Sequence, residues 1–311
     1  MTAKRLIVIA GPTAVGKTDL AIKVAQHLDT EIINADSRQI YHEMVIGTAV
    51  PSTEQLAMVK HHLIKHKSIH DYYNASLFEQ EAIAAITLLF RKNDYVILTG
   101  GSGLYIDAVC RGIDDLPSVD LSIRESLHNE FLKVGLAGIQ ARLYETDPDY
   151  YGKVDLNNPK RILKALEIAE MTGRTYTSFL TGRAKAREFV VMKIGLDIPR
   201  AELHHRINTR VKDMLARGLL QEVENLRDFR NLNALNTVGY KELFEYLDGK
   251  CSLEDALGHI GAHTRQYARR QVTWFRKDRA MQWFTPDALQ DILSFIQQES
   301  KKNGTEGNQT F

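Results

Sequence analysis

Several features that mark particular classes of protein are scarce in this chain of 311 residues. Its two cysteines, Cys110 and Cys251, lie far apart, which excludes a disulfide framework or a cysteine-rich zinc site and indicates a reduced, intracellular protein. Neither sign of charge is in excess, since the chain has 40 lysines and arginines and 39 aspartates and glutamates. Any RNA partner must therefore bind to a local patch of positive charge. The apolar run of residues 6–10 is too short for a signal peptide or for the ~20 residues that span a bilayer, so we expect a cytoplasmic protein with no membrane partner.

Short apolar runs alternate with helix-like segments along much of the chain. The runs typical of buried strands are residues 6–10, 31–35, 61–64, 94–100 and 191–197. Such alternation predicts an α/β fold in which helices flank a parallel sheet. We assign this core to residues 1–112 and 188–299, with C-terminal helices within 201–217, 220–229, 239–247 and 253–276. Residues 113–187 lack strand signals and are predicted to form a helical insertion, and the polar residues 300–311 are predicted to form a flexible tail.

A glycine-rich segment follows the first predicted strand and precedes a helical pattern. It comprises Gly11, Pro12, Thr13, Ala14, Val15, Gly16, Lys17 and Thr18, and it fits the phosphate-loop pattern G-x-x-x-x-G-K-[ST]. In such a loop the backbone N–H groups form an anion site, the lysine places a positive charge on the terminal phosphate, and the threonine hydroxyl can ligate Mg²⁺. The segment therefore predicts binding of a diphosphate or triphosphate together with Mg²⁺, without specifying a base or sugar.

Two further polar segments follow predicted strands and should lie at the same edge of the sheet. Asp36 can be read as a Mg²⁺ ligand, as a general base, or as a cap of the following turn. Residues 100–103, Gly-Gly-Ser-Gly, do not fit the dinucleotide pattern G-x-G-x-x-G. They either allow a substrate to approach the backbone closely or form an ordinary turn.

The C-terminal helical region contains a basic segment. Residues 261–280 carry five arginines and one lysine against one aspartate, with Tyr267, Trp274 and Phe275 between them. This pattern fits either an RNA-phosphate footprint with aromatic surfaces for bases, or the solvated face of a helix whose aromatics point into the core. Arg206 and Arg210 lie one helical turn apart, so one or both can reach the phosphate crevice. The histidine pairs at 61–62 and 204–205 are not at metal-ligand spacing, so no structural zinc site is expected.

Seven motifs together resemble the bacterial tRNA dimethylallyltransferase family, also called tRNA isopentenyltransferases. They are GPTAVGKT (11–18), INADSRQIY (33–41), HHL (61–63), LTGGSGLYI (98–106), NNPKRILKALEI (157–168), VGYKEL (238–243) and TRQYARRQVTWFRKD (264–278). The resemblance spans residues 5 to about 284 and implies a P-loop NTPase-like core with a helical insertion that helps to grip the anticodon stem-loop of tRNA. The chain departs from the family at Ser102, where threonine is common, and at Lys65, where an acid is common.

The resemblance implies transfer of the dimethylallyl group from dimethylallyl diphosphate to the exocyclic amine of the adenosine just 3′ of the anticodon. The tRNAs concerned read codons that begin with U, and the products are N6-isopentenyladenosine and pyrophosphate. The positions that the resemblance assigns to tRNA contact are Asp36, Ser37, Arg38, Gln39, Ser102, Arg124, Lys160, Arg161, Ile162, Leu163, Lys164, Asn236, Thr237, Val238, Gly239, Tyr240, Lys241, Arg269, Arg270, Gln271, Val272, Thr273, Trp274, Phe275 and Arg276. We expect the enzyme to act as a monomer.

This chemistry assigns roles to five residues in and near the phosphate loop. The adenine amine is a poor nucleophile, and Asp36 suits the task of taking its proton. Charge that accumulates on the leaving pyrophosphate would meet the loop amides, Lys17, Arg210 and Mg²⁺ on Thr18. By the resemblance, Thr13 forms a hydrogen bond near the reacting centre. Because the base must leave its stack to enter such a crevice, we also expect base flipping.

Other functions fit parts of the sequence. A phosphate-loop kinase or NTPase would use Asp36 to bind Mg²⁺ and the basic helix as a lid over phosphates. An adenylate isopentenyltransferase would prenylate AMP or ADP in place of tRNA. An RNA-binding module with a vestigial phosphate loop conflicts with the intact Lys17 and Thr18.

Overall fold

The computed structural model describes residues 3–117 and 120–305. The chain divides into two compact units. Met1–Arg111 together with Ala186–Phe311 form the first, which we call the core unit, and Gly112–Lys185 form the second, the insertion unit. None of the helices within the described ranges combines the length and the apolar character that crossing a membrane requires.

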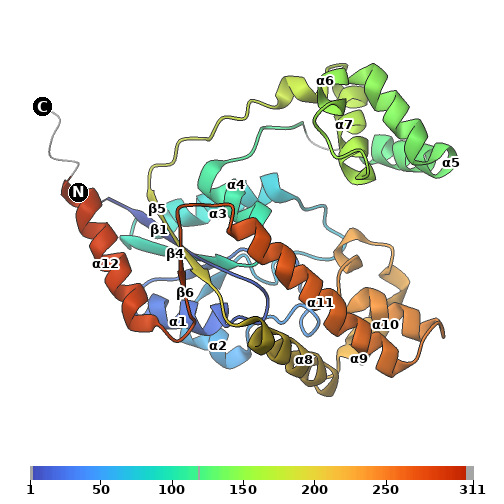
Figure 1. Ribbon diagram of the computed structural model, residues 1–311. Coiled ribbons are helices and arrows are strands. Elements are labelled where there is room, and N and C mark those ends of the chain that lie inside the picture. The colour runs from blue at the N-terminus through green and yellow to red at the C-terminus, as the bar shows by residue number, and fades with distance from the viewer. Residues whose placement is uncertain (1–2, 118–119, 306–311) are drawn as a thin grey trace, which may run out of the picture. The chain divides into compact units, whose positions relative to one another are not determined.

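A six-stranded parallel sheet runs through the core unit (Figure 1). Its strands are β1 (Arg5–Ala10), β2 (Ile32–Asn34), β3 (His61–His62), β4 (Tyr95–Gly100), β5 (Val190–Leu196) and β6 (Met281–Phe284), in the order β3-β2-β4-β1-β5-β6. At the carboxyl end of β1, Ala10 pairs with Gly100 of β4 and with Gly195 of β5. The loops that follow these strands therefore leave the sheet at one edge, which is where parallel α/β proteins bind their ligands.

Five of these strands lie where the sequence predicts them, but β6 is not predicted. Its four residues, MQWF, include a glutamine and follow a charged stretch at 276–279, so no local apolar run separates them from a loop. The strand exists because it pairs with the end of β5, from Lys193 opposite Met281 to Leu196 opposite Phe284. Pairing with a distant strand determines its conformation here, a cause that sequence periodicity does not reveal.

Helices cover both faces of the sheet. Those of the core unit are α1 (Lys17–His27), α2 (Thr53–Met58), α3 (Ala75–Leu89), α4 (Gly103–Arg111), α8 (Arg200–Ala216), α9 (Leu219–Asn225), α10 (Tyr240–Leu247), α11 (Leu253–Phe275) and α12 (Leu289–Thr305), with short 3₁₀ turns at Arg227–Phe229 and Asn233–Leu235. Several helices begin where the sequence provides a cap: Ser52 and Ser252 each complete a capping box, and Asn74 accepts a hydrogen bond from the N–H of Leu77.

The side chains of the strands alternate between two hydrophobic clusters. Leu6 and Val8 of β1 point to one face, where they join a cluster with residues of α3, α4, α9, α10 and α11. Ile7 and Ile9 point to the other face, where the cluster includes residues of α1, α8 and α12. Because the strands are buried on both faces, they appear in the sequence as continuous apolar runs.

Helix α12 differs from the expected flexible tail. The helix continues through Thr305, so residues 300–305 are helical, and residues 306–311 lie outside the described part of the chain. Contacts with the amino ends of two strands hold this helix: Arg5 donates a hydrogen bond of 2.7 Å to the carbonyl of Ser300, and the hydroxyls of Tyr95 and Ser300 lie 2.9 Å apart. These contacts come from residues 205 and 295 positions away in the sequence, so the polar composition of the segment does not reveal them.

The insertion unit consists of helices with a small core of their own. They are α5 (Leu121–Thr146), α6 (Pro148–Tyr151), α7 (Pro159–Thr172) and a 3₁₀ turn at Tyr176–Phe179. Helix α5 is kinked at Gly135, which adopts a positive φ of 68°. Leu127, Ile139 and Leu143 of α5 pack against Ile162 and Leu166 of α7.

Candidate active site

The phosphate loop joins β1 to α1 at the carboxyl edge of the sheet. Gly16 has a φ of 107° and precedes α1 without any side-chain cap. A side chain at this position would be strained and would also crowd Pro286, since an added Cβ would lie 3.2 Å from the Cβ of that proline. Because no side chain caps α1, the N–H groups at its start are available to an anion.

Two cations lie beside the loop in a poorly solvated environment. Desolvation and, to a lesser extent, the charge of Arg210 lower the pKa of Lys17 to about 8, and the charge of Asp36 opposes both effects. Desolvation also lowers the pKa of Arg210, with Asp19 and Asp36 acting in the opposite direction. Two desolvated positive charges close together are costly in the free protein, and a bound polyanion would relieve that cost.

The helix that follows β5 supplies both arginines that the sequence predicts for this crevice. From α8, Arg206 donates to the carbonyl of Val15 at 3.1 Å, and Arg210 donates to the hydroxyl of Thr13 at 3.3 Å. Their spacing of four residues places both on the face of α8 that contacts the loop. Both arginines therefore contact the phosphate loop, where the sequence left open whether one or both reach it.

Gln271 of α11 connects the phosphate loop to the loop after β4. Its side-chain oxygen accepts a hydrogen bond of 2.9 Å from the N–H of Thr13, and its amide nitrogen donates one of 2.8 Å to the carbonyl of Gly101. The side chain is buried, with 5% exposed. The resemblance assigns Gln271 to tRNA contact, but in this structure both ends of its amide bond to the protein, and the side chain connects two loops.

Asp36 follows β2 and faces the phosphate loop. Its Oδ1 accepts hydrogen bonds from the N–H groups of Arg38 (2.9 Å) and Gln39 (3.3 Å), so the capping interpretation applies to this one oxygen. Oδ2 is left available to a ligand in the cavities described next. Ser102 supports the same turn, because its hydroxyl accepts a hydrogen bond of 2.9 Å from the N–H of Ser37.

Two cavities meet at this carboxylate. The first, which we call the phosphate cavity, measures about 630 Å³ and is lined by the phosphate loop, by Arg206 and by the apolar side chain of Val50. The second, the neighbouring cavity, measures about 620 Å³ and is lined by Arg38, residues 236–239 and Arg270. The residues that line both cavities are Thr13, Asp36, Thr48, Ala49, Arg210, Met214 and Tyr267. One carboxylate can thus contact ligands bound in either cavity.

The segment 44–49, which contributes to both cavities, is held by a single carboxylate from α9. Oε2 of Glu222 accepts hydrogen bonds from the N–H groups of Val45 (2.9 Å) and Ile46 (2.7 Å). Oε1 accepts from the N–H of Gly47 (2.9 Å) and from the hydroxyl of Tyr240 (2.6 Å). Sequence analysis misses Glu222, because its partners lie up to 177 residues away and nothing local distinguishes this glutamate from others.

Tyr240 is placed differently from what the resemblance implies. The sequence analysis assigned it to tRNA contact, but its side chain has no exposed surface and its ring packs against Gly47, where an added Cβ would lie 2.6 Å from the ring. Burial is the main cause of its raised pKa, so the hydroxyl stays protonated and donates to Glu222. The nearby residues 236–239 and Lys241 do line the neighbouring cavity.

The basic helix α11 combines both interpretations that the sequence allows. Arg269, Arg270, Thr273 and Arg276 are exposed, whereas Phe275 belongs to the hydrophobic core and its side chain cannot reach RNA. Trp274 is 40% exposed and donates a hydrogen bond of 2.9 Å to Asp107. The aromatics are thus divided: Phe275 is structural, Trp274 is partly accessible, and Tyr267 lines both cavities.

The expected tRNA-contact residues of the insertion unit also fall into two groups. Lys160 and Arg161 are exposed on α7, whereas Ile162 is buried in the core of the unit and Leu163 is half-buried. Arg124 and Lys164 form ion pairs with the buried Glu167, at 2.9 and 3.2 Å. The side chain of Ile162 therefore supports the helix and does not contact a partner.

No group of three or more histidine, cysteine or acidic residues that would hold a metal ion occurs within residues 3–117 and 120–305. Beside the phosphate loop, the oxygen donors are the hydroxyl of Thr18 and the carboxylates of Asp19 and Asp36, all of which line the phosphate cavity. Magnesium accepts such hard oxygen ligands and commonly completes its shell with water and substrate phosphates. The donor set therefore fits Mg²⁺ bound jointly with a diphosphate.

The sheet order, the phosphate loop and the two desolvated cations define a P-loop-like α/β protein with a preformed anion site. Residues 39–278, more than half of the chain, match the family model described as IPP transferase, and the chain belongs to this family. It is 49% identical over 301 residues to tRNA dimethylallyltransferase 1 of Bacteroides fragilis, covering 97% of this chain and 100% of the relative. It is 50% identical over 291 residues to tRNA dimethylallyltransferase 1 of Phocaeicola vulgatus, covering 94% and 97%.

Solved structures agree with this assignment. The tRNA isopentenylpyrophosphate transferase of Bacillus halodurans is 32% identical with a TM-score of 0.71, and the match covers 98% of this chain and 99% of that one. A eukaryotic dimethylallyltransferase acting on tRNA is 30% identical with a TM-score of 0.71, covering 88% of this chain and 70% of that one. The fold class and the family that the sequence motifs indicate are confirmed.

Proposed function

We propose that the protein transfers the dimethylallyl group from dimethylallyl diphosphate to the exocyclic amine of the adenosine 3′-adjacent to the anticodon, in tRNAs that read codons beginning with U. The products are N6-isopentenyladenosine and pyrophosphate. The observation that carries this proposal is the meeting of two cavities at Asp36 and Thr13: the first is lined by much of the phosphate loop, and the second by Thr13 alone of that loop. A transfer between a diphosphate donor and a nucleobase acceptor needs two such spaces with a shared wall. Membership of the IPP transferase family supports the same reaction.

The phosphate cavity suits the donor. The loop N–H groups, Lys17 and Arg210 would bind the diphosphate, and they would stabilise the charge that grows on it as the bond between its oxygen and the allylic carbon breaks. The apolar surfaces of Val50 and Met214 in the same cavity suit the dimethylallyl group. The departing electron pair leaves with pyrophosphate, which the same cations retain.

The neighbouring cavity suits the acceptor. An adenine that leaves its stack can place its amine against Asp36, which takes one amine proton as the new nitrogen–carbon bond forms. Tyr267 offers a flat ring beside this point, and burial, its largest influence, raises its pKa to about 12, so the hydroxyl is neutral at physiological pH. Stacking on an aromatic ring is a common way to hold an unstacked base.

Magnesium would be held by Thr18 and by carboxylates of the phosphate cavity, and when bound it would neutralise charge on the diphosphate. The exposed arginines of α11 and the exposed Lys160 and Arg161 of the insertion unit are proposed to contact tRNA. We also propose that the enzyme acts as a monomer.

A transfer assay tests the proposal. The protein is incubated with Mg²⁺, radiolabelled dimethylallyl diphosphate and unmodified tRNA, and label in the RNA is counted. We expect label that disappears when the adenosine 3′ of the anticodon is replaced by guanosine. Label on AMP and none on tRNA would assign the protein to free-nucleotide prenylation, and ATP hydrolysis without any transfer would support the kinase or NTPase alternative.

Substitution of the proposed base makes the test specific to the site. Asp36→Ala should lower turnover by roughly 10²–10⁴-fold, which is the usual contribution of a general base, while tRNA binding changes much less. The matched control is Asp29→Asn, an exposed carboxylate at the end of α1, which should behave as wild type. Near-normal turnover of Asp36→Ala would show that Asp36 is not the general base.

A further inference from the structure

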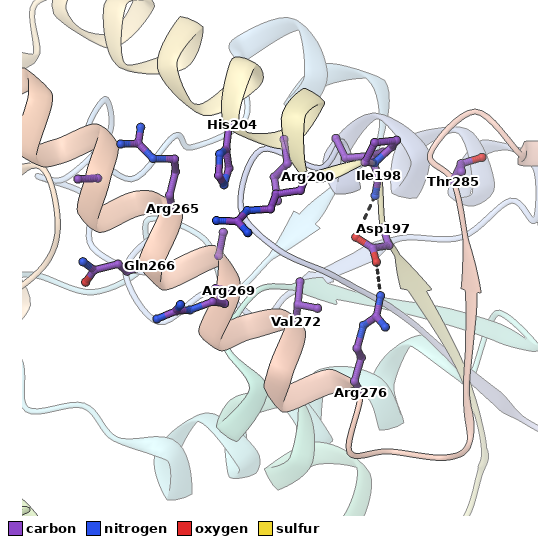
Figure 2. Close-up of a pocket in the computed structure, with 14 residues that line it drawn as sticks. Asp197, Ile198, Arg200, His204, Arg265, Gln266, Arg269, Val272, Arg276 and Thr285 are labelled. Atoms are coloured by element: carbon purple, nitrogen blue, oxygen red, sulfur yellow. Dashed lines mark hydrogen bonds and ion pairs between the residues drawn. The ribbon is translucent and has the colours of Figure 1, made fainter.

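A third cavity of the core unit is distinct from the phosphate cavity and the neighbouring cavity. It measures about 910 Å³ and lies between the first turns of α8 and one face of α11, beside the carboxyl end of β5 (Figure 2). Its apolar surface includes Ile198, Leu203 and Val272. We call it the arginine cavity, because Arg200, Arg265, Arg269 and Arg276 line it together with His204.

Its positive charge is mostly uncompensated. Asp197 is the sole acid in the lining, and it forms an ion pair of 2.7 Å with Arg276. Arg265 donates to the neutral side chain of Asn208 at 2.8 Å, and within the described residues Arg200 and Arg269 form no ion pair. Figure 2 shows Arg200 and His204 reaching from α8 into the space beside α11. Three guanidinium groups thus line an apolar space without a carboxylate partner.

The titration of His204 reflects the same surroundings. Desolvation is the main cause of its lowered pKa, and the charges of Arg200 and Arg265 lower it further. A neutral imidazole can accept a hydrogen bond, for example from a ribose hydroxyl. The cavity therefore combines guanidinium donors with an uncharged acceptor.

The arginine cavity adjoins the proposed acceptor site. Gln266 of α11 lines both the arginine cavity and the neighbouring cavity. The same helix presents Arg270 to the neighbouring cavity and Arg269 to the arginine cavity. Because α11 advances only about 5.4 Å per turn, an RNA strand with one base in the neighbouring cavity can continue along the helix to the arginine cavity.

We propose that the arginine cavity binds the ribose-phosphate backbone of the nucleotide that flanks the reacting adenosine in the tRNA. The inference rests on the proposed function and extends the RNA footprint from α11 to Arg200 and His204 at the start of α8. Guanidinium groups bind phosphates through paired hydrogen bonds and also stack on bases, and the apolar surface between them suits a sugar or base face. An apolar protein partner would leave the three arginines unpaired.

The test compares Arg200→Gln and Arg265→Gln with the control Arg91→Gln. Arg91 is an exposed arginine just before β4, at the opposite edge of the sheet, and its substitution removes the same charge. Binding of tRNA is measured without donor between 50 and 200 mM salt. We expect each cavity variant to weaken binding roughly three- to tenfold and to reduce the salt slope by about one, as loss of one phosphate contact does.

Further readouts separate this role from a structural one. At saturating tRNA, turnover and the KM for dimethylallyl diphosphate should be unchanged in both variants, and thermal unfolding should match wild type. Arg200→Lys should restore the salt slope, because it keeps the charge, while recovering only part of the affinity. If a glutamine variant has a lower melting temperature than wild type, the lysine variant at the same position, Arg200→Lys or Arg265→Lys, takes its place. A partial loss of tRNA affinity in the lysine variant tests the same contact.

Three results would overturn the inference. The first is a cavity variant that binds tRNA with the affinity and salt slope of Arg91→Gln. The second is a loss of affinity with an unchanged salt slope. The third is calorimetric binding of AMP or pyrophosphate that Arg200→Gln abolishes while tRNA binding stays normal, which would assign the cavity to a small anion. Failure of the proposed function would give a different result from failure of this inference. In that case the wild-type protein would bind tRNA but transfer no label to it in the transfer assay.

Discussion

The loss of stability on substitution of Glu222 can be estimated from the structure. Its carboxylate is the common acceptor of four hydrogen bonds that shape the segment 44–49. Glu222→Gln keeps the size of the side chain but replaces one oxygen by an NH₂ group. If this group faces Gly47 and Tyr240, the tyrosine hydroxyl can turn and accept, whereas the N–H of Gly47 has no acceptor. An unsatisfied buried donor costs about 1–3 kcal/mol.

The loss of charge adds to this cost. Hydrogen bonds from Val45 and Ile46 change from a charged to a neutral acceptor, which weakens each by about 0.5–1 kcal/mol. The sum is about 3 kcal/mol, which corresponds to a drop in the melting temperature of roughly 6–12 °C for a domain of this size. Because Thr48 and Ala49 line both cavities, kcat/KM should also fall at least about tenfold, even at 25 °C where the protein remains folded.

Thermal unfolding and the transfer assay, run side by side, check this prediction. Glu224→Gln is the matched control, since Glu224 lies on the same helix and is exposed. A melting temperature within about 2 °C of this control, together with normal kcat/KM, would refute the reasoning that one carboxylate holds the segment. Normal activity with a lowered melting temperature would limit the role of Glu222 to stability.

Two further predictions concern the phosphate cavity. Since the pKa of Lys17 is lowered to about 8, its charge is present below that pH and lost above it, so kcat/KM for dimethylallyl diphosphate should fall as pH rises through about 8. The kcat should fall only at higher pH, because a bound diphosphate favours the protonated lysine; a kcat/KM that is flat to pH 9.5 contradicts the assignment. Gly100→Ala should displace the backbone before Asp36 and abolish most activity, since its Cβ would lie 2.2 Å from the carbonyl oxygen of Ala35. Gly258→Ala, in α11 with nothing within 4 Å of the added Cβ, should be neutral or slightly stabilising in thermal unfolding, and equal behaviour of the two variants would contradict the packing argument.

The parts of the fold and site that sequence analysis predicts are those that local patterns encode. Continuous apolar runs predict five strands, and the phosphate-loop pattern predicts the anion site between β1 and α1. Asp36 is predicted at this edge because the carboxyl ends of parallel strands converge there. A spacing of four residues predicts that Arg206 and Arg210 share the helix face that meets the loop.

The parts that it misses depend on contacts between distant segments. β6 is a strand because β5 offers it hydrogen bonds, and Glu222 matters because three N–H groups some 175 residues away point toward it. Gln271 illustrates a related error: its motif indicates RNA contact, but its position on the inner face of α11 turns the side chain toward Thr13. A motif identifies which residues matter, whereas the direction of a side chain is set by the packing of its helix.

The hydrogen bonds of Gln271 also have a thermodynamic consequence. Helix α11 lines all three cavities, and this one side chain ties it to the N–H of Thr13 in the phosphate loop. A shift of α11 that accompanies RNA binding would therefore reach the phosphate cavity through Gln271, as well as through Tyr267 of the same helix. Linkage then requires reciprocity: the factor by which tRNA changes the affinity for dimethylallyl diphosphate equals the factor by which the diphosphate changes the affinity for tRNA. A substitution of Gln271 that weakens this connection should therefore lower both factors equally.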